Sequence, residues 1–326
     1  MEVENESKLH NYAYDPFQVE AIKCIDNDEN VLITAHTGCG KTAIAEHAIW
    51  RTLRNTDKKV IFTSPIKALS NEKYYDWQRK LEAFGIEAED LGLLTGDIKV
   101  NPDARLVIMT AEILHNMNLE EMTDIATVVM DEVHWVSDPD RGKVWEGTLL
   151  KLPQTVQVVL LSATIDKPEK FAGWIEKVRD RKTHAIATDY RVVPLKHFII
   201  AADNLHQTYE AKQPFDFDTF TRIKEDGYSS THRLNKAVEL LVRKNKAPVI
   251  FFCMSRKNCE KYARQVRVVA NTHEERREIE IMCFNLLKKY PEVRELAVYR
   301  ELTELFNKGI AFHHSGMIPI LKELVE

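Results

Sequence analysis

The sequence predicts an α/β fold built on a parallel sheet. Short apolar runs of strand length recur through the first 190 residues, and longer amphipathic stretches of helical period separate most of them. The runs are apolar at nearly every position, which is typical of strands that helices cover on both faces. In such sheets ligands bind outside the carboxyl ends of the strands. The residues that follow each run are therefore the first candidates for function.

The expected strands and helices of this part alternate along the chain. The runs have strand length and are rich in β-branched residues, and helical stretches follow all of them except the last. The expected strands are 30–35, 59–64, 105–110, 127–131, 156–162 and 183–188. The expected helices are 41–54, 67–84, 111–118, 142–152 and 168–178.

Residues 201–232 interrupt the alternation. This stretch is polar and lacks a clear period, so we expect a linker or an insertion. Beyond it the expected helices are 235–244, 255–268, 273–307 and 319–326, and the expected strands are 248–253 and 310–314. A second α/β unit therefore begins near residue 233, and we expect it to be incomplete.

Length, charge and composition limit the function classes. A chain of 326 residues exceeds one average domain, and no apolar run reaches the length of a membrane span. The N-terminus is acidic and polar, which argues against a secretory signal. The net charge of −5 argues against binding of polyanions by a global positive field, so any contact with nucleic acid must be local.

Cysteine and histidine spacing argues against a zinc site. The five cysteines include no CxxC pair, and none of the 12 histidines pairs with another at i,i+4. His313 and His314 fall in an expected strand, where successive side chains point to opposite faces, so they do not share an ion. We expect no zinc, no disulfide framework and an intracellular environment, cytoplasmic or nuclear.

The first expected strand leads into a phosphate-binding pattern, AHTGCGKT. Gly38 and Gly40 permit the turns that aim backbone N–H groups at phosphate oxygens, and Lys41 supplies a mobile positive charge. The Thr42 hydroxyl can ligate Mg²⁺ at the start of the next helix. A chance glycine-rich turn is the alternative, and the strand before and helix after argue against it. The expected nucleotide-binding residues of this loop are Ala35, His36, Thr37, Gly38, Cys39, Gly40, Lys41 and Thr42.

Two adjacent carboxylates follow the fourth expected strand, in VVMDEVHWVSD at 128–138. Carboxylates at the mouth of an apolar strand are costly to desolvate unless a cation or a reacting water needs them. We expect Asp131 to hold Mg²⁺ and Glu132 to orient and deprotonate the attacking water. Asp131 as a simple helix cap is the alternative, and the phosphate loop makes it the weaker one. His134 taken alone could be an ordinary hydrogen-bonded core histidine.

Seven segments that follow one another in order carry a family resemblance. They are YAYDPFQ (12–18), TSPIKALSNEKY (63–74), LLTGDIKVNPDARLVIMTAEIL (93–114), DEVH (131–134), LSAT (161–164), VIFFCMSRKNCEKYA (249–263) and GIAFHHSGMIPILKELVE (309–326). Together they resemble the superfamily-two DExH-box RNA helicases, in particular the exosome-associated branch that includes the superkiller helicase and its nuclear relative. The resemblance covers the chain from about residue 12 to its last residue.

The resemblance implies a fold and a nucleotide site. It implies a RecA-like ATP-binding domain at 1–190, a linker or insertion at 191–232, and the N-terminal part of a second RecA-like domain at 233–326. ATP and Mg²⁺ are the implied cofactors. Tyr12 would stack on the adenine and Gln18 would hydrogen-bond its edge. His134 would connect the nucleotide to LSAT through Ser162 and Thr164, for which ordinary strand-end capping is the alternative.

The resemblance also implies contacts to single-stranded RNA. Two of the implied RNA-binding residues also have an ordinary explanation. Lys67 could equally be a solvated helix lysine, and Ser255 could be an N-cap that needs no RNA. The contacts would be to the sugar-phosphate backbone, so selection of base sequence should be weak. The implied activity is 3′ to 5′ RNA unwinding driven by ATP, with exosome-type RNA-decay partners and no membrane. The implied RNA-binding residues are Pro65, Lys67, Gly96 and Thr110 in the first domain and Ser255 and Arg256 in the second.

The sequence departs from the family at its end. It contains no Gly-Arg dipeptide and stops before the motifs whose arginines would reach the γ-phosphate. We therefore expect the front portion of a helicase. One alternative is a non-catalytic fragment that binds nucleotide and RNA, and another is a DNA-directed helicase relative.

Overall fold

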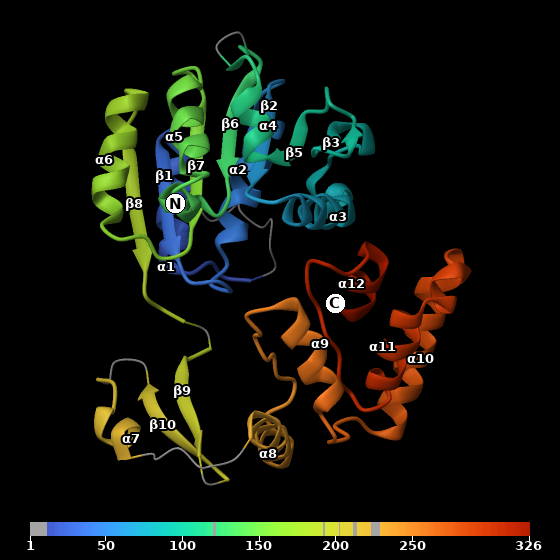
Figure 1. Cartoon of the computed structure of the whole chain (residues 1–326). Coiled ribbons are helices and arrows are strands. Elements are labelled where there is room, and N and C mark those ends of the chain that lie inside the picture. The colour runs from blue at the N-terminus through green and yellow to red at the C-terminus, as the bar shows by residue number, and fades with distance from the viewer. Residues whose placement is uncertain (1–11, 120–121, 192, 202, 211–213, 223–228) are drawn as a thin grey trace. The chain divides into compact units, whose positions relative to one another are not determined.

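The structure is a computed structural model, and it describes residues 12–119, 122–191, 193–201, 203–210, 214–222 and 229–326. By its internal contacts the chain divides into two units, Met1–Val193 and Pro194–Glu326, which are described separately (Figure 1). Among the described residues, no helix has both the length and the apolar character that crossing a membrane requires.

The first unit is built on an eight-stranded sheet with the strand order β4-β3-β5-β2-β6-β7-β1-β8 (Figure 1). All neighbouring strands are parallel except β3 and β4. The carboxyl ends of β1, β7 and β6 therefore lie beside one another, as do those of β2 and β5. The strands are β1 (Asn30–Ala35), β2 (Lys59–Ser64), β3 (Leu91–Leu94), β4 (Lys99–Val100), β5 (Leu106–Thr110), β6 (Ile125–Met130), β7 (Gln157–Ser162) and β8 (Thr183–Thr188).

Helices cover both faces of this sheet, and each face has its own hydrophobic core. Val31 and Ile33 of β1 belong to one core, while Leu32 between them belongs to the other. The strands are apolar at successive positions because both of their faces are buried. On one face lie α1 (Pro16–Asp26), α2 (Lys41–Asn55) and α3 (Lys67–Phe84), and on the other lie α4 (Ala111–Asn116), α5 (Gly142–Lys151) and α6 (Pro168–Arg179).

The parallel sheet that the sequence predicts is confirmed, and all six expected strands of the first unit are present. The sequence patterns did not predict α1, β3 or β4. Strand β3 is short and contains Gly92, where an added Cβ would lie 2.2 Å from the carbonyl oxygen of Asn101. A glycine at this close approach interrupts the apolar run that identifies a strand.

The second unit contains an antiparallel strand pair and helices. A core that includes Leu287, Leu302 and Leu321 holds its C-terminal helices together. Its elements are β9 (Lys196–Ala201), β10 (Asn204–Glu210), α7 (Phe217–Arg222), α8 (Ser230–Arg243), α9 (Arg256–Gln265), α10 (His273–Leu286), α11 (Ala297–Phe306) and α12 (Pro319–Val325). The stretch 201–232, expected as a linker or insertion, thus contains β10 and α7.

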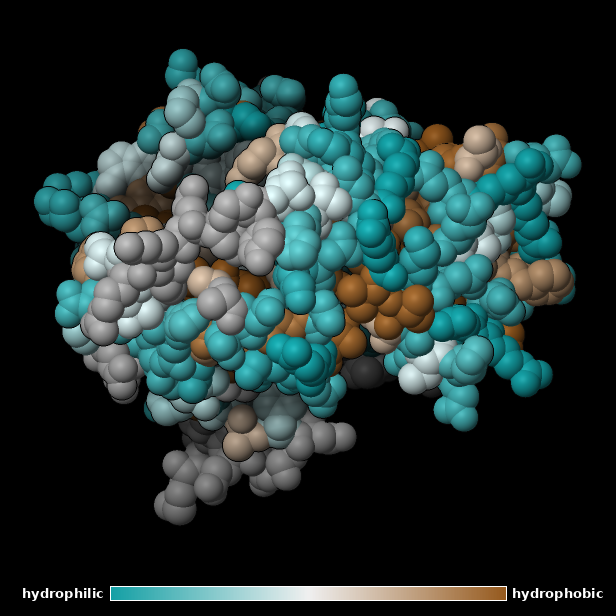
Figure 2. All heavy atoms as spheres, turned by 60° about the horizontal axis from the view of Figure 1, so that its bottom comes forward, coloured by the Kyte–Doolittle hydropathy of each residue, from teal (hydrophilic) through white to brown (hydrophobic). Residues whose placement is uncertain are grey.

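Two expected strands of the second unit are wrong. Residues 248–253 and 310–314 have no regular secondary structure. A parallel strand needs neighbours that complete its hydrogen bonds, and none of the described strands pairs with either run. Ile250 and Phe252 are consequently 79% and 88% exposed. Hydrophobic residues (brown) do come to the surface between polar ones in the space-filling view of Figure 2.

The histidine pair lies in one of these irregular runs, so the strand geometry expected there does not apply. Nε2 of His313 lies 2.8 Å from Glu326 Oε1, and Nε2 of His314 lies 3.0 Å from Glu260 Oε1. The two rings therefore have different carboxylate partners, and the expectation that they do not share one ion stays a prediction.

Candidate functional site

The phosphate loop connects the carboxyl end of β1 to the start of α2. Gly38 and Gly40 have φ of +84° and +82°, a conformation that residues with a Cβ rarely adopt, and Gly40 is the N-cap of α2. The Nζ of Lys41 donates to the carbonyl oxygens of Ala35, at 2.6 Å, and His36, at 3.2 Å. The ammonium is thus held over the loop, while Thr42 is exposed in the first turn of α2.

The acid pair lies at the carboxyl end of β6, separated from β1 in the sheet by β7. The backbone N–H of Asp131 donates to Thr63 at the end of β2, at 2.9 Å, which anchors the segment. Glu132 has φ of +52°, and its N–H donates to Oδ1 of Asp131 at 2.9 Å. This left-handed residue turns the chain sharply from the strand into the 3₁₀ helix Val133–Ser137, so that the two carboxylates occupy the strand end.

Electrostatics join the loop to the acid pair. Burial lowers the pKa of Lys41, while the nearby carboxylates of Glu132 and Asp131 act to raise it. Burial raises the pKa of Asp131, and the charge of Glu132 adds to this, against the opposing effects of Lys73 and Lys41. The charges of Lys41 and of the two carboxylates thus oppose the effect of burial on one another. A cation bound beside Asp131 would relieve the repulsion between the two carboxylates.

The expected relay from His134 to the LSAT segment is not formed among the described residues. Nδ1 of His134 lies 3.2 Å from Oε2 of Glu132, but the two are not in hydrogen-bond geometry, and Nδ1 is buried without a hydrogen-bond partner. Ser162, at the end of β7, also has a buried hydroxyl without a partner, and Thr164 is exposed. The coupling roles of these three residues stay predictions.

The expected adenine-reading segment contacts the phosphate loop. The side-chain amide of Gln18 accepts from the N–H of Asp15 at 2.8 Å and donates to the carbonyl oxygen of Gly40 at 2.9 Å. Gln18 is only 3% exposed, and a Cβ on Gly40 would lie 2.6 Å from its Nε2. Tyr12 is 55% exposed and packs edge-on against Tyr14. Gln18 therefore supports the loop, and its contact with adenine stays a prediction.

The four expected RNA-binding residues of the first unit lie along the same edge of the sheet. Pro65 follows Ser64, which pairs in register with Thr110, so the ends of β2 and β5 adjoin. Thr110 is the N-cap of α4. Lys67 Nζ lies 2.6 Å from Asp97 Oδ2, and a Cβ on Gly96 would lie 2.9 Å from this Nζ. The structure thus brings these residues together in two adjacent pairs.

The expected RNA-binding residues of the second unit lie at the start of α9. The Ser255 hydroxyl accepts from the N–H of Asn258 at 3.2 Å, so it does act as an N-cap, which was the alternative reading. Arg256 is exposed and lies beside Gly316, where a Cβ would be 3.3 Å from the guanidinium. RNA contacts at both positions stay predictions.

Two contacts that the sequence analysis missed hold the phosphate loop to the segment after β8. The Cys39 thiol donates to the carbonyl oxygen of Tyr190 at 3.0 Å. The guanidinium of Arg191 donates to Nδ1 of His36 at 3.0 Å, which leaves the proton of a neutral ring on Nε2. No local pattern could reveal these contacts, because they depend on β8 pairing with β1.

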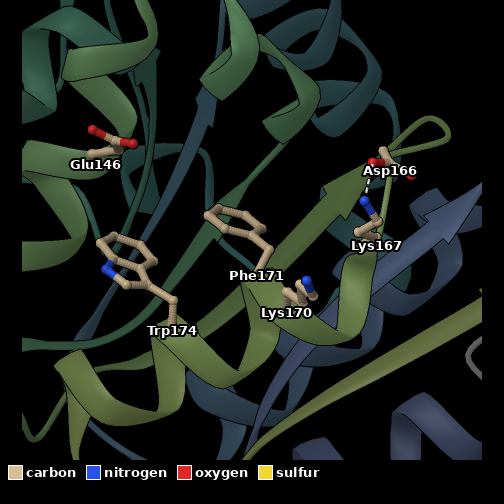
Figure 3. A pocket seen from close by; sticks show the side chains of 6 residues that line it. All are labelled: Glu146, Asp166, Lys167, Lys170, Phe171 and Trp174. Atoms are coloured by element: carbon tan, nitrogen blue, oxygen red, sulfur yellow. Dashed lines mark ion pairs between the residues drawn. The ribbon is translucent and has the colours of Figure 1, made fainter.

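A surface hollow of about 370 Å³ on α5 and α6 contains none of the expected site residues. The rings of Phe171 and Trp174 stack there at 5.7 Å with an interplanar angle of 7°, and Lys167 pairs with Asp166 (Figure 3). Both rings also pack against the core beneath them. The hollow is therefore separate from the candidate nucleotide site.

Cys24, Glu29 and His184 place potential metal ligands within 4.8 Å of one another, near the amino ends of β1 and β8. The Glu29 carboxylate already accepts from His184 at 2.8 Å and pairs with Lys182 at 3.4 Å. Burial raises the pKa of Cys24, which favours the protonated thiol over the thiolate that metals bind. The absence of zinc stays a prediction.

Comparison with known proteins identifies the class. A profile of the DEAD/DEAH box helicase family matches residues 15–171, which include the phosphate loop and the acid pair. This match shows that residues 15–171 form a DEAD/DEAH box helicase domain, which agrees with the RecA-like arrangement of the sheet.

Similar proteins include an exosome RNA helicase, an uncharacterized helicase and a superkiller complex protein. The chain is 39% identical to the exosome RNA helicase MTR4 of Homo sapiens, over 98% of the chain and 32% of that protein. It is 40% identical to an uncharacterized helicase of Schizosaccharomyces pombe, over 98% and 32%. It is 33% identical to superkiller complex protein 2 of Homo sapiens, over 97% and 27%. The resemblance to the exosome-associated branch is thus confirmed, and the chain spans about a third of the length of these relatives.

A solved structure supports the fold. The crystal structure of the DUF1998 helicase MrfA superimposes with a TM-score of 0.55 and 18% sequence identity, over 83% of this chain and 42% of that one. At this identity the similarity concerns only the fold. It agrees with the RecA-like architecture that the sequence resemblance implies.

Proposed function

We propose that this chain binds ATP with Mg²⁺ and single-stranded RNA, and that it supplies the ATP-hydrolysing part of a 3′ to 5′ RNA helicase. The observation that carries the proposal is the position of the phosphate loop and of Asp131 and Glu132 at the carboxyl ends of β1 and β6, which only β7 separates in the sheet. The names of the relatives, which include exosome and superkiller proteins, support an intracellular role in RNA processing or decay with partners of that type.

The donors fit magnesium. Asp131 offers a carboxylate oxygen and Thr42 a hydroxyl oxygen, and Mg²⁺ prefers hard oxygen ligands. When bound, the ion would neutralise charge on the β- and γ-phosphates. Lys41 exchanges its bonds to the carbonyl oxygens of Ala35 and His36 for phosphate oxygens, and backbone N–H groups at the start of α2 bind the same anion. Glu132 accepts a proton from the water that attacks the γ-phosphate.

RNA would lie across the ends of β2, β3 and β5. Lys67 supplies a cation, and the N–H groups at the start of α4 and near Gly96 suit phosphate oxygens. Lys67 leaves Asp97 when it binds phosphate, and this exposed pair contributes little stability, so the exchange costs little. Because these contacts are to the backbone, the chain would bind many RNA sequences with similar affinity.

Nucleotide binding is tested first, with a fluorescent ATP analogue. Lys41→Ala should weaken binding about a hundredfold, because the only mobile cation of the loop is lost. The control is Lys58→Ala, at an exposed position before β2, which should leave the affinity unchanged. Retained affinity in Lys41→Ala would contradict the assignment of the phosphate loop.

Turnover and RNA binding are tested next. Glu132→Gln should keep the ATP affinity and lose hydrolysis, since the amide accepts no proton. RNA-stimulated ATP turnover by the wild-type chain would exclude the non-catalytic fragment. Stronger competition by single-stranded DNA than by RNA for the bound strand would instead favour a DNA-directed enzyme.

A further inference from the structure

Arg141 joins three segments of the first unit. Its Nε donates to Oε1 of Glu112 at 3.0 Å, and its Nη2 donates to the same carboxylate and to the carbonyl oxygen of Pro65. The guanidinium carbon lies 4.8 Å from the ring centre of Trp135 and 5.8 Å from that of Trp145. One side chain thus makes contacts of two kinds, hydrogen bonds at its edge and cation–π contacts at its faces.

The three segments belong to different parts of the candidate site. Pro65 follows β2, and Glu112 is in the first turn of α4, two residues after Thr110. Trp135 is in the 3₁₀ helix Val133–Ser137, which begins immediately after the acid pair. Arg141 therefore lies between the segment that carries the catalytic carboxylates and the two strand ends proposed to hold RNA.

The backbone around Arg141 is itself fixed. Its N–H donates to Oδ1 of Asp138 at 2.8 Å, and the N–H of Gly142 donates to the Asp138 carbonyl oxygen at 2.9 Å. A Cβ at Gly142 would lie 2.2 Å from the carbonyl oxygen of Val136, so only glycine fits this close approach. The guanidinium thus projects from a rigid turn, which is what a residue that sets the spacing of other segments requires.

We propose that Arg141 is a positioning residue for RNA binding. It holds the segment after β2 and the first turn of α4 at a fixed spacing, so that the backbone groups near Pro65 and Thr110 meet successive phosphates. It also ties this spacing to the helix that follows the acid pair. The inference rests on the RNA-binding role proposed above. Lysine cannot replace this arginine, because an ammonium lacks the planar group that bonds and stacks at once.

A direct contact between Arg141 and an RNA phosphate is the competing explanation, and Glu112 distinguishes the two. If Arg141 binds phosphate, Glu112→Gln removes a competing negative charge and RNA binding tightens. If Arg141 positions the two segments, the same change weakens its bond to α4, and RNA binding falls. The two explanations therefore predict opposite signs for one substitution.

The experiment measures the affinity for a labelled single-stranded oligouridine by fluorescence anisotropy at fixed salt. Arg141→Lys and Glu112→Gln should each weaken binding roughly fivefold to tenfold, and the double variant should be no weaker than the weaker single one. The matched control is Arg79→Lys, whose exposed side chain pairs with Asp76 on the surface of α3 and should leave the affinity within about twofold.

Two further measurements separate positioning from folding. The affinity for the fluorescent ATP analogue should stay unchanged in both variants, and circular dichroism melts should show both to be folded at the temperature of the RNA measurement. A parallel loss of nucleotide affinity would show that Arg141 only maintains the fold and would overturn the inference. Unchanged RNA affinity in Arg141→Lys, or tighter binding in Glu112→Gln, would also overturn it. Failure of the wild-type chain to bind oligouridine would instead reject the proposed function.

Discussion

The apolar runs at 128–130 in the first unit and 249–252 in the second are of the same kind in sequence, yet they end in opposite environments. Val128, Val129 and Met130 are fully buried in β6, between β2 and β7 and between two layers of helices. Phe252 is 88% exposed and belongs to no strand. An apolar run becomes a parallel strand only where other segments complete its hydrogen bonds and cover its faces. A buried parallel strand therefore needs an apolar run, but an apolar run does not by itself form a strand.

An aspartate substitution in each of the two apolar runs should give the largest difference in stability. Val129→Asp puts a charge into a core without a partner and should destabilise the first unit by more than about 4 kcal/mol, enough to prevent its folding at 37 °C. Phe252→Asp places the same group at an exposed position and should leave the thermal midpoint within about 1 °C. Circular dichroism melts measure both. A cooperative melt of Val129→Asp at the wild-type midpoint, or a large decrease in the midpoint of Phe252→Asp, would contradict the difference in burial between the two runs.

A buried arginine of the first unit and a surface arginine of the second should differ in their contribution to stability by an intermediate amount. Arg179 is 1% exposed and its guanidinium donates to backbone carbonyl oxygens of residues 149, 152, 153 and 156. Burial, with a smaller effect of Arg181, lowers the pKa of Arg179 to about 10, so it remains charged at neutral pH. Arg264 of the second unit instead pairs at the surface with Glu260 and Glu301.

Arg179→Met should cost roughly 3 kcal/mol, because it leaves several buried carbonyl oxygens without donors. Arg264→Met should cost less than about 1 kcal/mol, as surface ion pairs contribute little. Urea unfolding of each variant against the wild type measures the two losses. Equal losses would mean that the second unit depends on its surface ion pairs more than its exposure suggests.

The smallest expected effect concerns the acid pair. The folded pKa of Asp131 is raised, chiefly by burial, so ionisation of this carboxyl opposes folding at pH values above its unfolded pKa. Asp131→Asn should therefore raise the thermal midpoint at pH 7 by on the order of 2 °C, and the gain should vanish as the pH falls below the ordinary pKa of 3.8, where the carboxyl is protonated in both the folded and the unfolded state. This gain would accompany loss of hydrolysis.

Ionisation of Glu260 in the second unit should have the opposite effect on folding stability. Arg264 and His314 lower its folded pKa against the opposing effect of desolvation, so its ionised form favours folding above its unfolded pKa. Glu260→Gln should lower the midpoint slightly at pH 7 and have no effect in acid.

For Asp131→Asn, a midpoint lower than that of the wild type would contradict the prediction. It would show that the carboxylate stabilises the fold through its bond to the Glu132 N–H.

The candidate site was predictable residue by residue where function depends on local pattern. Gly38, Gly40 and Lys41 predict a phosphate loop because the turn conformation and the charge are properties of a short segment. The acid pair was predictable because charged residues directly after an apolar strand are rare without a ligand. Gln18 was found only through the family resemblance, and its bond to Gly40 was not foreseen, since the two residues are far apart in sequence.

Other features could not be predicted because they depend on partners elsewhere in the chain. Arg141 has no local signal: its neighbours Pro65 and Glu112 come from segments that only the strand order brings beside it. The contact of Arg191 with His36 likewise requires β8 to pair with β1. The expected strands at 248–253 and 310–314 failed for the same reason, because pairing is a property of two segments and not of one.

By itself the sequence determined six of the eight strands of the first unit, the end of the sheet at which the candidate residues lie and the family that the chain resembles. These follow from apolar periodicity, glycine conformations and charged residues at strand ends, all of which act within a few residues. Only the tertiary structure decided the strand order, which places the phosphate loop and the acid pair at one edge of the sheet, and the three-way contact of Arg141. The physical reason is that hydrogen bonding between strands and electrostatic attraction act between groups close in space, whatever their separation along the chain.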